Sequence, residues 1–164
     1  MNTVWAGLGK AHSGDLLLFG AHDLEARLYY LGGGSPIRHA NINISGYKLG
    51  LGLGASVSLV FVLAHGYASA SEIAGTSGGW DFEIDIGAKL GDVLKGVKGL
   101  GRVIDTMEKF EKLKYAAENA IKNLGITKPG IYTIPIPGPG IGLHLWAGFA
   151  FGDVTLISAG QGLP

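Results

Sequence analysis

The chain has 164 residues, a formal net charge of zero and no cysteine, which excludes disulfides, thiolate metal sites and a cysteine nucleophile. Its length, without a visible linker, predicts a single domain covering residues 1–164. Nine Lys or Arg and five Asp or Glu lie between Lys89 and Lys128, an excess too small to indicate a nucleic-acid binder.

Residues 1–14 lack the basic and apolar regions of a secretory signal, so a cytoplasmic or peripheral-membrane location is expected. From residue 15 to residue 31 apolar and charged side chains alternate, which predicts one or two strands. Residues 32–36 form a predicted turn and residues 37–44 a short strand. Ser45 and Gly46 then form either a tight turn or a bulge.

Residues 47–65 are predicted to form a long strand, because their side chains alternate strictly between two unlike faces. One face is apolar throughout. The other face is nearly bare and consists of Gly50, Gly52, Gly54, Ser56 and Ser58. A bare face lets another backbone, a helix or a flat apolar ligand approach closely. Gly50, Gly52 and Gly54 are therefore candidate contact positions.

Residues 49–71 contain no Asp, Glu, Lys or Arg and are the one candidate for a membrane span. Each of the glycines in this segment would weaken a helix by about 1 kcal/mol. The alternation also favours a strand, so we predict no transmembrane helix.

Residues 65–79 are small and polar, which predicts a loop with one helical turn at most. Residues 80–90 alternate again and predict a half-buried strand with Asp81, Glu83 and Asp85 on one face. Carboxylates at alternate positions of a strand are about 7 Å apart, too far to hold one calcium ion. A solvated face is the better interpretation.

A change of period predicts one long amphipathic helix over about residues 92–124, with Asp92 as its start and Gly125 at its end. One stripe of this helix is basic and consists of Lys95, Lys98, Arg102, Lys109 and Lys112. A basic stripe on such a helix suits anionic lipid head groups. The alternative is an ordinary solvated face with local pairs such as Glu108 with Lys112.

Residues 126–139 contain four prolines and predict an extended connector or an edge strand. Residues 141–159 predict a final strand or hairpin whose small-residue face resembles that of residues 47–65. The predicted fold class is α+β. It is a curved, mainly antiparallel sheet or incomplete β-barrel of about five to seven strands, packed with the one long amphipathic helix.

The sequence carries no motif that indicates catalysis. The five histidines share no metal-ligand spacing, no serine lies in a G-x-S-x-G setting, and neither glycine cluster has the form of a phosphate loop. We therefore predict that the protein is not an enzyme and holds no metal and no cofactor.

Several segments together resemble the SYLF domain, also called the Ysc84-type domain. They are residues 34–36 (GSP), 42–50 (INISGYKLG), 53–56 (LGAS), 59–63 (LVFVL), 79–80 (GW), 85–88 (DIGA) and the closing hairpin 139–156. The resemblance implies a lipid-binding module that acts on membrane surfaces, with phosphoinositide and actin association in eukaryotic members. It assigns no individual binding residue, because the matching positions are glycines and aliphatic residues.

The predicted function is a non-enzymatic module that binds lipid or a membrane surface, with anionic lipid or an apolar ligand as its partner. The predicted contact residues are Lys95, Lys98, Arg102, Lys109, Lys112, Gly50, Gly52 and Gly54. Two alternatives stay open. One is a self-assembling structural or interaction protein that forms a homo-oligomer, and the other is a bacterial effector or pore-forming protein that inserts residues 49–71 into a bilayer.

Overall fold

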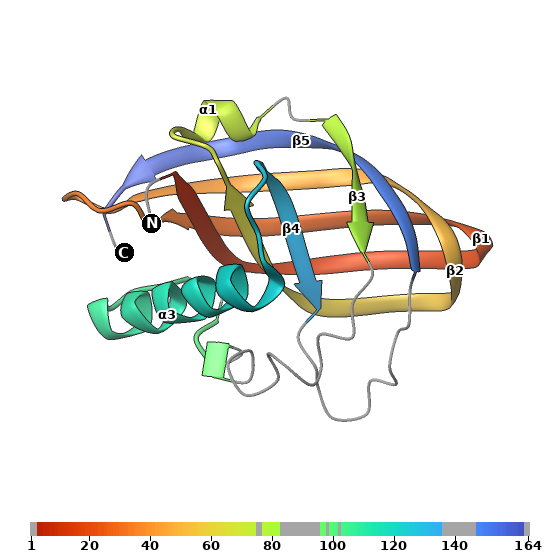
Figure 1. Cartoon of the computed structure of the whole chain (residues 1–164), viewed down its shortest axis with the longest axis horizontal. Helices are drawn as coiled ribbons and strands as arrows, with labels where there is room; N and C mark the ends of the chain where they lie inside the picture. Colours follow the sequence, from red (N-terminus) through yellow and green to blue (C-terminus); the bar gives the residue numbers. More distant parts are fainter. Residues whose placement is uncertain are drawn as a thin grey trace.

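The computed structural model describes residues 3–74, 77–82, 96–97, 99–101, 103–135 and 147–162, and within residues 11–22, 46–58, 77–82, 133–135 and 147–153 it describes the backbone alone. Five antiparallel strands form one sheet (Figure 1), and its order is β1-β2-β5-β3, with β4 also paired to β2. The strands are β1 (Val4–Tyr30), β2 (Arg38–His65), β3 (Ser77–Phe82), β4 (Gly130–Pro135) and β5 (Ala147–Gln161). The helices are α1 (Ala70–Ile73) and α3 (Met107–Leu124).

Strands β1 and β2 form one long hairpin. This hairpin bends so that its two halves lie against each other as two layers. Their register runs from Val4 opposite His65 to Tyr29 opposite His39, and it shifts once, between Leu17 and Phe19. Figure 1 shows the hairpin turning back at the end of the sheet that lies away from α3. The two ends of β1 meet again, because the Leu31 amide donates a hydrogen bond of 2.8 Å to the Val4 carbonyl oxygen.

Glycine lets the two layers of this bent hairpin close on each other. A Cβ at Gly7 would collide with the carbonyl oxygen of Arg27, and a Cβ at Gly9 would lie 2.7 Å from the carbonyl oxygen of Glu25. Only a residue without a side chain permits such a close approach of two backbones. We call this part of the sheet, residues 4–9, 23–31, 38–45, 59–65 and 154–161, the helix-side part.

An apolar core fills the space between the two layers of the helix-side part. Its buried members are Trp5, Leu24, Ala26, Leu28, Ala40, Ile42, Ile44, Val60, Val62, Ala64, Ile73, Ile131 and Val154. Within each strand these residues occupy alternate positions, as a pleated strand requires. We call the face of β1, β2 and β5 that carries Leu24, Ile42 and Val154 the core face, and the opposite face, which carries Glu25 and Asn43, the open face.

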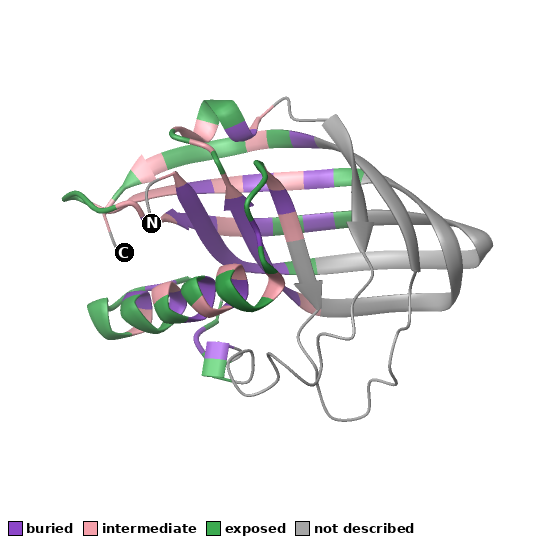
Figure 2. Cartoon of the chain, viewed as in Figure 1, coloured by how far each residue is buried: buried purple, intermediate pink, exposed green. Residues whose placement is uncertain are grey.

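A second core lies between α3 and the layer of the sheet that contains the start of β1 and the end of β2. Its buried members include Val4, Ala6 and Leu8 of β1, Phe61 and Leu63 of β2, and Phe110, Leu113, Ala117 and Ala120 of α3. Residues 60–64 of β2 are thus buried on both faces, which explains why they form an unbroken apolar run. Within the part of the chain that Figure 2 colours by burial, buried residues lie on these strands and on α3.

The prediction of one helix from residue 92 to residue 124 is wrong at its start, because α3 has 18 residues and begins at Met107. Gly101 adopts a positive φ of 73°, which is not a helical conformation. Thr106 then caps α3, since its hydroxyl oxygen accepts a hydrogen bond from the Lys109 amide. The predicted end is confirmed, because Gly125 is left-handed with φ 63°.

The fold class α+β is confirmed, and within the described residues the sheet does not close on itself. The long strand predicted from residue 47 is confirmed but begins earlier, at Arg38.

The interpretation of Ser45 and Gly46 as a turn or bulge is wrong, because both pair regularly with β1 and β5. The single helical turn within residues 65–79 and the edge strand within residues 126–139 are confirmed as α1 and β4. The predicted strand over residues 80–90 is present up to Phe82, and residues 83–90 lie outside the described residues.

Candidate functional site

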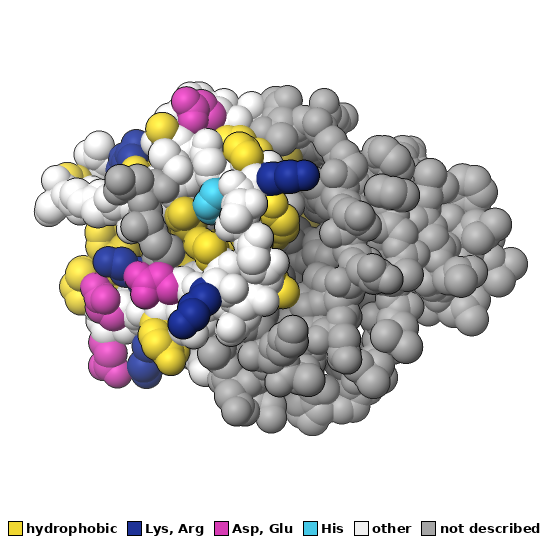
Figure 3. All heavy atoms as spheres, in the orientation of Figure 1, with side chains coloured by type: hydrophobic (Ala, Val, Ile, Leu, Met, Phe, Trp, Pro, Cys, Tyr) yellow, Lys and Arg dark blue, Asp and Glu magenta, His cyan; other side chains and the backbone are white. Residues whose placement is uncertain are grey.

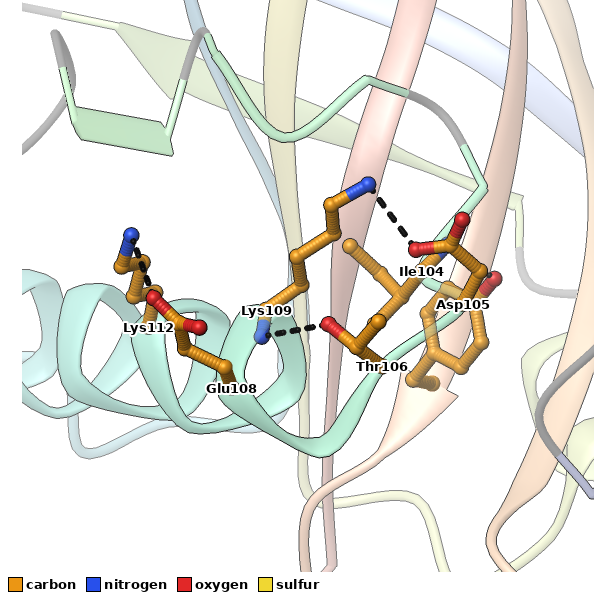
Figure 4. A network of polar contacts seen from close by, with 7 residues as sticks. Ile104, Asp105, Thr106, Glu108, Lys109 and Lys112 are labelled. Atoms are coloured by element: carbon orange, nitrogen blue, oxygen red, sulfur yellow. Dashed lines mark hydrogen bonds and ion pairs between the residues drawn. The ribbon is translucent and has the colours of Figure 1, made fainter.

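Two of the five basic residues predicted to form a stripe lie on α3, and both are paired with carboxylates. Lys109 Nζ lies 2.8 Å from an oxygen of Asp105, and Lys112 Nζ lies 3.3 Å from an oxygen of Glu108 (Figure 4). The hydrogen bond from Lys109 lowers the pKa of the Asp105 carboxyl. Lys95, Lys98 and Arg102 lie outside the described residues. The two described residues of the stripe are therefore both members of local ion pairs.

The surface of α3 carries charges of both signs. Between residues 105 and 122, four lysines accompany four Asp or Glu residues. Figure 3 shows basic and acidic side chains beside one another over this helix. Two large apolar side chains are exposed on the same segment, namely Met107 at 55% and Tyr115 at 63%. The helix thus exposes apolar groups without a net cationic field around them.

The predicted glycines lie where the hairpin bends. Gly50 pairs with Gly148 of β5, Gly52 with Leu17 of β1, and Gly54 with Asp15 of β1. Across the bend two residues of β2, Gly50 and Leu51, oppose one residue of β1, which is the arrangement of a β-bulge. Glycine within a strand commonly marks such a bend. We call residues 11–21, 47–57 and 147–152 the bend-side part.

On the bend-side part, small residues continue the core face. The register of β2 with β5 is regular from Ile42 to Leu51, so alternate residues share one face along this stretch. The positions that continue the face of Ile42, Ile44 and Val154 are Gly46, Lys48 and Gly50 of β2 with Gly148, Ala150 and Gly152 of β5. Gly52, Gly54, Ser56 and Ser58 continue this alternation along β2 to Val60 and Val62. The bare face predicted from the sequence is therefore an extension of the core face.

The open face changes from polar to apolar in straight rows across β1, β2 and β5. Each row contains one residue of each strand in register. The polar rows are Glu25, Asn43 and Thr155, and then Asp23, Ser45 and Asp153; the apolar rows that follow are Ala21, Tyr47 and Phe151, and then Phe19, Leu49 and Phe149. Among the polar residues, Asp23, Glu25, Ser45 and Thr155 are exposed. The boundary therefore runs perpendicular to the strands.

These rows could not be predicted from the sequence, because they depend on which strands lie side by side. The apolar face of residues 47–65 was visible, but its neighbours Phe19 and Phe149 are brought beside it only by the register of β1 and β5. Gly7 and Gly9 were missed as well. Their signal was present, since residues 4–9 (VWAGLG) alternate as a strand does.

The described histidines and arginines make structural contacts. Arg27 Nε donates to the Tyr29 hydroxyl oxygen at 2.8 Å, and the same oxygen accepts from the Ile104 amide at 2.8 Å. His39 Nδ1 lies 3.2 Å from the Gly162 carbonyl oxygen. Burial, and secondarily the Arg27 charge, lower the pKa of His39. In the described part of the chain no three His, Asp or Glu side chains are grouped as metal ligands.

No family model, curated protein or solved structure matches the chain. The resemblance to the SYLF domain stays a prediction. Among the helices that the structure describes, none combines the length and the apolar character needed to cross a bilayer.

Proposed function

We propose that the protein is a non-enzymatic module that binds a membrane surface, with the apolar rows of the open face as the contact. The observation that carries the proposal is the straight boundary on that face, where the rows through Ser45 and Asn43 are polar and the rows through Tyr47 and Leu49 are apolar. The proposal takes this face to be uncovered in the free protein, and an uncovered apolar surface marks an interaction site because leaving it in water is unfavourable by about 25 cal/mol per Å².

Lipid is the partner that fits the two faces of the bend-side part. Strands that lie against lipid alternate apolar residues on the lipid side with small or polar residues on the other side. Here Tyr47, Leu49 and Leu51 alternate with Lys48 and Gly50 along β2. A tyrosine beside the polar boundary also fits, since aromatic residues with a polar group favour the membrane interface.

The lysines of α3 would add a smaller, charge-dependent share of the binding. A basic residue near an anionic membrane contributes about 1 kcal/mol. Lys109 and Lys112 would first have to leave their partners Asp105 and Glu108. We expect this share to weaken as salt is raised, because salt screens interactions between exposed charges.

Vesicle co-sedimentation tests the proposal. The protein is mixed with phosphatidylcholine vesicles, with and without an anionic lipid, at low and at moderate salt. We expect it to pellet with vesicles in every condition and somewhat more with anionic lipid at low salt. A protein that stays in the supernatant in all four conditions would contradict the proposal.

Self-assembly is the second candidate, because β5 has a strand edge with which no described strand pairs. β3 pairs with residues 148–153 of β5, whereas residues 154–161 pair only with β2 among the described strands. Ile157 on this stretch is 59% exposed, and exposed strand edges can pair with a second chain. Light scattering separates the candidates, since a monomer at micromolar concentration contradicts self-assembly.

A further inference from the structure

We propose that α1 controls pairing at the outer edge of β5. While α1 is in place this edge stays unpaired, and when α1 is displaced the edge pairs with a second copy of the chain. We call residues 154–161 of β5 the β5 edge stretch. The proposal does not rest on membrane binding. It concerns the edge on which the self-assembly candidate depends, and it names the element that keeps this edge unpaired.

The β5 edge stretch has a strand on one side only. β2 pairs with it from Ile44 opposite Val154 to Arg38 opposite Gln161, whereas β3 reaches no further than Asp153. In the part of the chain that the structure describes, no strand pairs with the other side of the stretch. The amide and carbonyl groups of such an edge can bind a further extended strand.

The helix α1 covers the beginning of this stretch. It precedes β3 in the chain and lies against β5, as Figure 1 shows. Ile73 of α1 is fully buried in the same core cluster as Val154, and Leu156 is partly buried against that cluster. Covering a strand edge with a helix is one way in which proteins prevent edge pairing.

Beyond Leu156 the stretch is uncovered on both faces. Ser158 lies on the open face and Ala159 on the core face, and both are exposed. Between these residues and Leu156, β5 has one extra residue relative to β2, Ile157, which is 59% exposed. A β-bulge of this kind bends an edge, and a short or bent edge resists pairing. The edge therefore becomes long enough to pair only when α1 no longer covers its beginning.

The position of α1 depends on one buried side chain. The helix has four residues and no side-chain cap at its start, and Ile73 is its buried residue. A helix this short is not stable alone. The chain just before it is tied to the sheet, because Trp5 Nε1 donates a hydrogen bond of 2.9 Å to the Tyr67 carbonyl oxygen. Arg38 Nη1 likewise donates to the Ala68 carbonyl oxygen at 3.2 Å. Truncating Ile73 should therefore release α1 while the preceding segment stays attached.

A second copy of the chain is the partner that fits this edge. The β5 edge stretch contains no Asp, Glu, Lys, Arg or Pro, and so lacks the residues by which edges commonly resist pairing. Two such stretches can pair antiparallel about a two-fold axis, because each presents the same donors and acceptors. The formal net charge of the chain is zero, so two copies do not repel each other through net charge.

Light scattering on variants of α1 tests the proposal. We expect Ile73→Ala to show about a two-fold higher mass at micromolar concentration, as for a two-fold dimer. Adding Ile157→Lys should return this mass to that of the monomer, because a lysine on a strand edge opposes pairing. The same lysine should leave the mass of the natural protein unchanged. Ile73→Thr, which places a hydroxyl in the core, is the second variant in case circular dichroism shows that Ile73→Ala does not fold.

Leu113→Ala is the matched control, since Leu113 is as fully buried as Ile73 but lies in the core beneath α3. We expect this variant to keep the mass of the natural protein. The proposal is overturned if the folded Ile73 variants stay monomeric, if Leu113→Ala dimerises equally, or if Ile157→Lys does not dissolve the dimer. A dimer of the natural protein that Ile157→Lys dissolves would also overturn it, while supporting the self-assembly candidate. Vesicle co-sedimentation of the natural protein tests the proposed function alone.

Discussion

Strand β2 passes through two parts of the molecule that use the same alternation in opposite ways. In the helix-side part Ile42, Ile44, Val60 and Val62 fill the core face with bulky side chains, and all of them are buried. In the bend-side part the same face continues as glycine, serine and Lys48, while the bulky residues lie on the other face. The helix-side part therefore stabilises the fold, and the bend-side part is the region that we propose as the contact with a membrane.

This difference separates stability from binding along a single strand. Substitutions in the helix-side part should lower the free energy of unfolding, whereas substitutions of bulky residues in the bend-side part should change vesicle binding instead.

The largest effect is expected for Phe61→Ala. Phe61 is fully buried between the sheet and α3, and truncating such a residue removes its burial and leaves a cavity. We expect the free energy of unfolding to fall by about 3–5 kcal/mol. Leu49→Ala is the matched variant in the bend-side part. Because the proposed function places Leu49 in the membrane contact, we expect a loss of about 0.5 kcal/mol or less, together with weaker vesicle binding. Chemical denaturation measures both, and equal losses would remove the distinction between the two parts.

The second effect is expected for Gly7→Ala, which tests the closure of the two layers. A Cβ at this position collides with the Arg27 carbonyl oxygen, and that oxygen belongs to the backbone of the other half of β1, which is itself paired with β2. We expect a loss of about 1–3 kcal/mol, the range for overpacking a core. Gly96→Ala is the control, because the space around Gly96 is open and its conformation is helical. A Gly7→Ala variant as stable as the control would show that the layers are farther apart than described.

Much of this fold could be predicted from the sequence, since its strands alternate clearly. The strand through residues 47–65, the turn α1, the edge strand β4 and the end of α3 all follow from local patterns. The start of α3 could not be predicted in this way, because the apolar spacing continues upstream through Val97, Leu100 and Ile104. These residues do reach the core, but from a segment that is not one helix. Their apolar spacing therefore reflects the burial of each residue and not a shared helix.

The candidate site was less predictable, because it depends on register between distant strands. Phe19, Leu49 and Phe149 share one row only because β2 pairs with β1 on one side and with β5 on the other. The bend has the same origin, since the bulge opposite Leu18 involves two strands at once. A single sequence shows which residues alternate but not which residues lie beside them. For the basic stripe, the pair of Lys112 with Glu108 was predicted as the alternative interpretation, and the structure adds the pair of Lys109 with Asp105.

A smaller effect is expected for Thr106→Ala, which tests where α3 begins. The Thr106 hydroxyl oxygen accepts a hydrogen bond of 3.2 Å from the Lys109 amide and thereby satisfies one free donor of the first helical turn. We expect a loss of about 1 kcal/mol. Thr106→Ser should restore most of it, and Thr127→Ala, at an exposed position beyond the helix, is the control. If Thr106→Ala is neutral while the control is also neutral, the helix does not begin at this cap.

The smallest effect is expected from acid titration of His39, which lies on the open face of the helix-side part opposite Tyr29. Burial, followed by the Arg27 charge, lowers the pKa of His39 below its ordinary value of 6.5, against a raising contribution from the Gly162 carbonyl. The folded state therefore favours the neutral ring, and the unfolded chain binds more protons between the lowered pKa and 6.5. This contribution to stability is present above pH 6.5 and is lost as the pH falls through the lowered pKa. His39→Gln should flatten this part of the stability profile in denaturation experiments, and an unchanged slope would show that His39 is not the group responsible.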